Sequence, residues 1–168
     1  MHTPIGALPV GTMETLPALE AGAVRALRLW FSGPEAQAAL WNAFAKTFGA
    51  QEGHRHLGAF ERFLAGVLEV SHRPLMRHAM GCRCLGADEH AFAGLLAAAA
   101  RGRREDALLL ALALTPPHRA LALVAEAEAV GPVLGRLAPL LAACCATAEE
   151  PRAAPDPDAA PARERVLH

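Results

Sequence analysis

The sequence predicts an all-α protein with a single domain, and three observations support this prediction. Hydrophobic residues make up 53% of the chain, but most of them are Ala and Leu, while Ile5 is the only isoleucine and tyrosine is absent. Strands favour β-branched and aromatic residues, so this composition favours helices. Apolar residues also recur at helical spacing, and 168 residues are enough to bury a core. We expect six to seven helices packed as antiparallel helical hairpins.

The chain divides into three predicted parts. Residues 1–13 are rich in Pro and Gly and form a flexible N-terminal lead-in. Residues 14–148 form the helical domain, which a loop at residues 72–87 interrupts. Residues 149–168 are rich in Pro, Ala and charged residues and lack apolar periodicity, so we expect a disordered C-terminal tail.

Three helices are expected before the loop, and their ends follow from local signals. The first helix is followed by a Ser-Gly-Pro-Glu run, in which Ser32 can cap the next helix while Glu35 reaches back to it. The second helix stops at Gly49, since glycine commonly ends helices. The third covers roughly residues 51–71, with its apolar residues on one stripe.

Three or four helices are expected after the loop. Asp88 is a suitable N-cap for the first of them, and a leucine-rich helix follows it. The next helix runs from about Pro117 and stops at Gly131. Pro132 then starts a seventh helix, which Pro139 should kink because proline removes a helical hydrogen bond.

Charge and composition disfavour several classes of protein. The net charge is −1, Lys46 is the single lysine, and the arginines are scattered among acidic residues. A nucleic-acid-binding protein normally has a basic face, so nucleic acid is not an expected partner. The N-terminus lacks the pattern of a secretory signal, which favours the cytoplasm. Prolines interrupt the most apolar stretch, residues 130–148, so we expect a core helix there rather than a membrane span.

The loop contains the strongest candidate for a functional site, four potential metal ligands in the order His72-x5-His78-x3-Cys82-x-Cys84. Cysteine thiolate and neutral imidazole are preferred zinc ligands. Both cysteines can face one metal ion if the intervening Arg83 points away. We therefore expect a structural zinc-type site that fastens the loop, with its binding free energy contributing to folding.

Two other interpretations of the loop remain open. Thiols just before a helix start lie at the positive end of the helix dipole, so Cys82 or Cys84 could be a low-pKa redox thiol with His78 or His90 as proton partner. The Cys-x-Cys followed by His90 distantly resembles the all-helical alkylhydroperoxidase D family, whose motif is Cys-x-x-Cys. In that family a histidine lies a few residues after the second cysteine. Here the spacing between the cysteines and the spacing to the histidine both differ from the family's motif, so its activity is not carried over. Alternatively, the cysteines are simply small apolar residues in a protein without a site.

The sequence favours an accessory or interaction protein over an enzyme. It contains no Gly-rich phosphate loop, no Gly-x-Ser-x-Gly and no His-Glu-x-x-His. We therefore expect a small cytoplasmic protein that presents a surface to a protein partner. Because Ala-rich helices pack closely, a homodimer is also compatible with the sequence.

Overall fold

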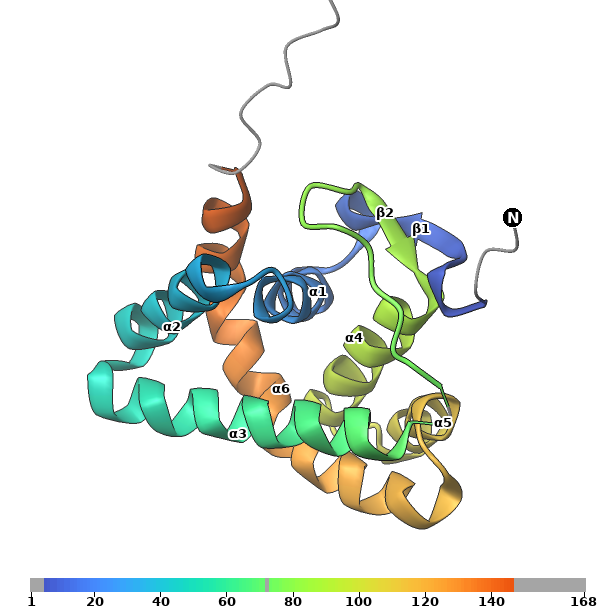
Figure 1. The fold of residues 1–168 in the computed structure, drawn as a ribbon. Coiled ribbons are helices and arrows are strands. Elements are labelled where there is room, and N and C mark those ends of the chain that lie inside the picture. The colour runs from blue at the N-terminus through green and yellow to red at the C-terminus, as the bar shows by residue number, and fades with distance from the viewer. Residues whose placement is uncertain (1–4, 72, 147–168) are drawn as a thin grey trace, which may run out of the picture.

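The computed structural model describes residues 5–71 and 73–146, and these residues form a helical domain with one small sheet (Figure 1). This confirms the predicted all-α class. All six helices of the described residues contribute side chains to one hydrophobic core. The elements are, in chain order, β1 (Pro9–Thr12), α1 (Ala18–Trp30), α2 (Pro34–Phe48), α3 (Ala50–Val70), β2 (Cys84–Gly86), α4 (Ala87–Ala100), α5 (Arg104–Leu114) and α6 (Pro117–Ala146).

Two helical hairpins are built on tight glycine turns. Helices α2 and α3 pack against each other and are joined by Gly49 alone, whose φ of 79° lies in the left-handed region. Helices α4 and α5 also pack together, and Gly102, with φ of 72°, lies in the turn between them. Glycine adopts this backbone conformation without the steric cost that a side chain would add. The predicted stop of the second helix at Gly49 is therefore confirmed.

The predicted break at Gly131 is wrong, because α6 continues from Pro117 to Ala146 with Pro132 and Pro139 inside it. In Figure 1 this helix runs through the whole domain. A Cβ atom on Gly131 would lie 2.4 Å from the Leu96 carbonyl oxygen, so glycine here allows α6 to cross α4 closely. Tertiary packing against α1, α3 and α4 thus outweighs the local cost of the two prolines.

The predicted capping box at Ser32 is also wrong. Helix α2 begins after Gly33, whose φ is 96°, and no side chain caps its first amides. The Ser32 hydroxyl instead donates a 2.7 Å hydrogen bond to the carbonyl of Arg28 in the last turn of α1. The serine therefore closes the preceding helix, a competing local use of its hydroxyl.

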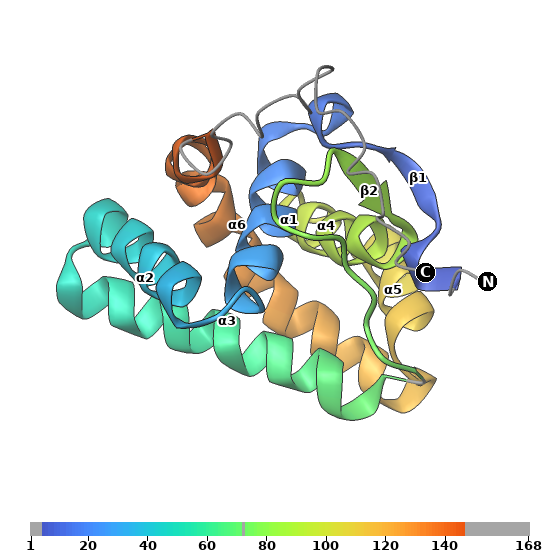
Figure 2. The same cartoon turned by 45° about the horizontal axis from the view of Figure 1, so that its top comes forward.

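The segment before α1 contains a strand that hydrophobic periodicity does not reveal. Strand β1 pairs antiparallel with β2, and Thr12 lies opposite Cys84. Figure 2 shows this small sheet beside the start of α4, at one end of the domain. The backbone amide of Met13 extends the pairing by donating to the Arg83 carbonyl at 2.9 Å. The N-terminal segment is thus attached to the loop that carries the two cysteines.

Within the described residues, one stretch of α6, Pro117–Cys144, is long and apolar enough to cross a membrane by length and composition alone. Core helices of soluble proteins meet the same criteria. Here α6 packs against five other helices and buries Leu134, Leu137 and Leu141 completely. These contacts fit a core helix.

Candidate functional site

The loop between α3 and α4 has little regular structure, yet two carboxylates at the start of α4 hold it in place. Asp88 is 4% exposed and Glu89 is fully buried. Helix α4 starts at Ala87 with Gly86 as its N-cap, so the predicted capping role of Asp88 is wrong. Because the helix starts earlier than expected, both carboxylates lie within its first turn and are directed to partners in the loop.

Asp88 fixes the beginning of the loop. It accepts two 2.6 Å hydrogen bonds from the Arg73 guanidinium and one of 2.8 Å from the Met76 amide. The bond to Asp88 raises the pKa of Arg73. Gly6 packs directly on this ion pair, because a Cβ atom there would lie only 2.0 Å from a carboxylate oxygen of Asp88. The N-terminal segment and the loop therefore meet at one buried carboxylate.

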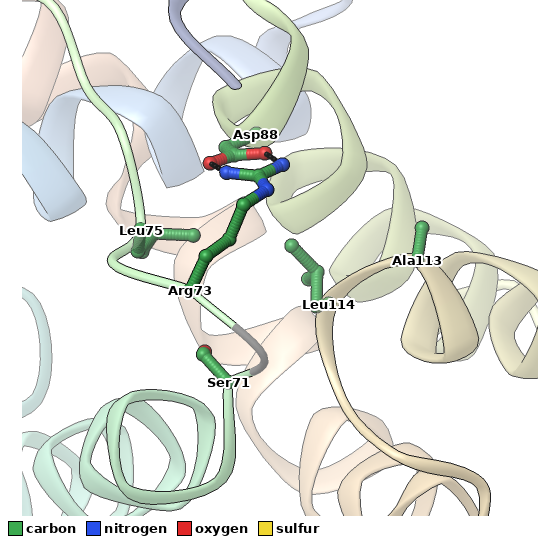
Figure 3. A pocket seen from close by; sticks show the side chains of 6 residues that line it. All are labelled: Ser71, Arg73, Leu75, Asp88, Ala113 and Leu114. Carbon is green, nitrogen blue, oxygen red and sulfur yellow. Dashed lines mark hydrogen bonds and ion pairs between the residues drawn. The ribbon is translucent and has the colours of Figure 1, made fainter. Parts of the chain in front are cut away.

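Figure 3 shows the Arg73–Asp88 pair at the edge of a small hollow. The cavity has a volume of about 60 Å³, whereas sites for organic ligands usually occupy about 300–1,000 Å³. Since the two charged groups already bind each other, we assign no substrate to this hollow. Its lining residues are Ser71, Arg73, Leu75, Asp88, Ala113 and Leu114.

Glu89 fixes the end of the loop and is the second anchor. Its carboxylate accepts hydrogen bonds from the backbone amides of His78, at 3.1 Å, and Gly86, at 3.0 Å. It also forms two bonds, of 2.7 and 2.8 Å, with the Arg28 guanidinium. Burial by itself would raise the pKa of Glu89, but the hydrogen bonds from Arg28 and the two amides hold that pKa below its ordinary value.

Arg28 connects this anchor to the two cysteines. It lies on α1, is 1% exposed, and donates to the backbone carbonyls of Cys82, at 2.6 Å, and Cys84, at 2.7 Å. In extended backbone, residues two apart direct their carbonyls and their side chains to the same sides. The guanidinium therefore holds the carbonyls on both sides of Arg83, and the second of them belongs to the first residue of β2. The intervening Arg83 is exposed, and its side chain binds Glu14 at 2.5 Å.

The two thiols lie together. Cys82 is half-buried and Cys84 is exposed, and Cys82 is the neighbour with the largest influence on the Cys84 thiol. The neighbouring Cys82 thiol is the main reason that the pKa of the Cys84 thiol is raised, and the positive charge of Arg28 counteracts this effect only in part. The direction is opposite to that of the low-pKa thiol that the redox interpretation expects at Cys84.

The structure describes three of the four predicted ligands. His72 lies outside the described residues. His78 is part of the loop, but its buried Nε2 atom has no hydrogen-bond partner in the described part of the chain, and its ring lies against Gly86. His90 is exposed on α4. Among residues 5–71 and 73–146, no group of three or more His, Cys, Asp or Glu side chains is arranged to hold a metal ion. Of the predicted ligands, Cys82 and Cys84 share one contact, because their backbone carbonyls bind the same guanidinium.

Sequence reasoning missed Arg28 and the central role of Glu89. One signal was available, since Arg28 interrupts a predominantly apolar helix and follows the buried Leu27. A charged residue on a buried helix face needs a partner. No pattern in the sequence, however, identifies a partner that lies 61 residues further along the chain.

Comparisons with known proteins place no family beside this fold and site. No family model, no curated protein and no solved structure matches the chain. The class of the molecule therefore rests on its own features, a single all-α domain with a charge-anchored loop and a pair of thiols at its surface.

Proposed function

We propose that this protein is a small cytoplasmic accessory protein that acts through its central loop, where Cys82 and Cys84 bind a thiophilic metal ion of the zinc type. The observation that carries the proposal is the attachment of both cysteines to one guanidinium, since Arg28 donates to the Cys82 and the Cys84 carbonyls and is itself held by Glu89. Two thiolates of a Cys-x-Cys segment can bind one tetrahedral ion together. Nitrogen or oxygen ligands from a protein partner, or from solvent when the partner is absent, complete the coordination.

The anchors of the loop favour a binding role for the metal over the fold-holding role that the sequence suggests. Arg73 and Asp88 fix one end of the loop, and Arg28 and Glu89 fix the other. These contacts order the segment without any metal. Cys84 is also exposed, so an ion on the thiol pair would be accessible to a partner. We therefore assign the ion to the contact between this protein and its partner.

A thiol-redox protein is the second candidate, and the closeness of Cys82 and Cys84 favours it. Two adjacent thiols can lose their protons and two electrons to an oxidant and form a disulfide. The raised pKa of Cys84 counts against rapid attack by its thiolate at neutral pH. A third candidate is a helical interaction subunit in which the two cysteines only fill space, and here their replacement by serine would change neither stability nor partner binding.

A titration with Cd²⁺ tests the proposal, because this ion binds thiolates and gives a near-ultraviolet thiolate-to-metal absorption. The wild type should bind one ion per chain, with competition by Zn²⁺. Replacement of Cys82 or Cys84 by serine should weaken binding and reduce the absorption. The matched control is Cys144→Ser, a half-buried cysteine on α6, and it should bind like the wild type.

Cd²⁺ binding and peroxide treatment of the wild type together distinguish the three candidate functions. If the wild type does not bind Cd²⁺ but converts rapidly with peroxide to a form with a Cys82–Cys84 disulfide, as peptide mass mapping would show, the redox candidate replaces the metal proposal. If neither reaction depends on the two cysteines, only the interaction subunit without a site remains.

A further inference from the structure

The carbonyls of Cys82 and Cys84 meet the same buried guanidinium, and this arrangement is the basis of a further inference. Arg28 uses its Nε and both of its terminal nitrogens, two bonds to the cysteine carbonyls and two to Glu89, all between 2.6 and 2.8 Å. A guanidinium has a rigid planar arrangement of donors. It therefore fixes the distance and orientation of the two carbonyls relative to each other.

We propose that Arg28 is the positioning residue of the thiol site, and that it presets the Cys82 and Cys84 side chains as one two-sulfur ligand for a thiophilic ion. This inference rests on the proposed function. Arg28 does not touch the ion. It acts through the backbone, because carbonyls held on one side of the tripeptide leave both thiols on a common face.

Glu89 is the second residue that positions the two cysteines, because it holds Arg28. Its two oxygens bind Arg28 and leave the two terminal nitrogens directed at the cysteine carbonyls. It also accepts a hydrogen bond from the amide of Gly86, so one carboxylate fixes both the guanidinium and the end of β2, the strand that begins at Cys84. Outer groups that orient metal ligands typically contribute about 10- to 100-fold to metal affinity.

The position of Arg83 supports the same geometry from the opposite side. Its backbone carbonyl accepts from the Met13 amide at 2.9 Å, and its side chain binds Glu14. The central residue of the tripeptide is thus attached to the N-terminal segment, while its two neighbours are attached to α1. These attachments on either side of the tripeptide fix the backbone that carries the two thiols.

The variant Arg28→Lys tests the inference, because lysine keeps the charge but cannot bond to Glu89 and to both carbonyls in the same geometry. In the folded variant, Cd²⁺ affinity should fall by roughly 10- to 100-fold. The near-ultraviolet absorption at saturation should fall toward that of Cys84→Ser, which has only one thiolate at the site. The control Arg101→Lys changes the Arg101–Glu20 pair away from the loop and should bind like the wild type.

Two further variants distinguish loss of thiol positioning from a general loss of stability. In a Cys84→Ser background, Arg28→Lys should cause no further loss of Cd²⁺ affinity, since no thiol pair remains to be positioned. If Arg28→Lys does not fold, Glu89→Gln takes its place, because it keeps the size of the side chain but weakens its hold on Arg28. A folded variant that binds Cd²⁺ as tightly as the wild type, with undiminished absorption, overturns the inference.

Phenylarsine oxide provides a readout that does not depend on a metal ion. Its arsenic forms bonds to two thiol sulfurs, and the two thiol protons leave with the arsenic-bound oxygen as water. The wild type should bind it tightly and Arg28→Lys more weakly. If the wild type binds this probe but not Cd²⁺, and Arg28→Lys binds the probe more weakly, the proposed function fails while the positioning role stands. If the wild type and Arg28→Lys bind the probe equally, the positioning role fails whatever the result with Cd²⁺ is.

Discussion

The α2–α3 hairpin and the loop between α3 and α4 both contact α1, but different forces hold them. Leu40, Phe44 and Phe60 of the hairpin are completely buried, and the rings of the two phenylalanines lie 6.5 Å apart. The loop instead depends on Arg28 and Glu89, a charged pair that is equally buried. Apolar packing is non-directional and tolerates small shifts. A buried guanidinium and carboxylate are destabilised when they lose a hydrogen-bond partner, because an uncompensated charge then remains in the interior. The thiol pair therefore lies in the region that directional hydrogen bonds hold, and not in the region that apolar packing holds.

The largest expected effect comes from removing one member of the buried pair. Glu89→Ala should lower the free energy of unfolding by about 3–5 kcal/mol, because it leaves Arg28 charged and buried without its main partner. Urea unfolding followed by circular dichroism measures this change. Alkylation of Cys82, which is half-buried in the wild type, should become faster in the folded variant. A loss below about 1 kcal/mol would mean that the ion pair does not hold the loop.

A substitution in the hairpin sharpens the contrast. Leu40→Ala should cost about 2–5 kcal/mol of unfolding free energy, because it leaves a cavity in a closely packed core. Since the hairpin lies apart from the loop anchors, the rates of alkylation of Cys82 and Cys84 should stay unchanged in the folded protein. Faster alkylation in this variant would show that the two regions are not held independently.

Low pH should weaken the loop anchor selectively. The folded-state pKa of Glu89 lies below its ordinary value, so the ionised carboxylate contributes stability above the unfolded-state pKa of about 4.3. This contribution disappears as the pH falls through the folded-state pKa. We expect the urea midpoint of the wild type to decrease more steeply below about pH 4 than that of Glu89→Gln. Parallel curves for the two proteins would contradict the assignment.

The smallest expected effect concerns an ion pair at the surface. Arg101 binds Glu20 at 2.9 Å, but its side chain is 45% exposed. Exposed pairs typically contribute between 0 and about 1 kcal/mol, so Arg101→Ala should change the free energy of unfolding by less than about 1 kcal/mol. A loss as large as that of Glu89→Ala in the same urea experiment would remove the distinction between buried and exposed charge pairs.

The hairpin was predictable from the sequence because its signals are local. Apolar spacing and Gly49 place α2 and α3 within one or two residues of their observed bounds. Gly131 and Pro132 led to the wrong prediction that a helix ends there. In the sequence, a glycine that permits close helix crossing cannot be distinguished from one that ends a helix. The sequence also identified Cys82 and Cys84 as candidates. It did not reveal Arg28, since a hydrogen bond between residues distant in the chain leaves no periodic pattern.

X-ray absorption at the zinc edge of the zinc-loaded protein tests the central claim most directly. The account predicts two sulfur neighbours at about 2.3 Å, with nitrogen or oxygen atoms completing the coordination, and loss of both sulfurs in a Cys82→Ser/Cys84→Ser variant. A zinc environment without sulfur, or one that is the same in the wild type and in that variant, would contradict the account.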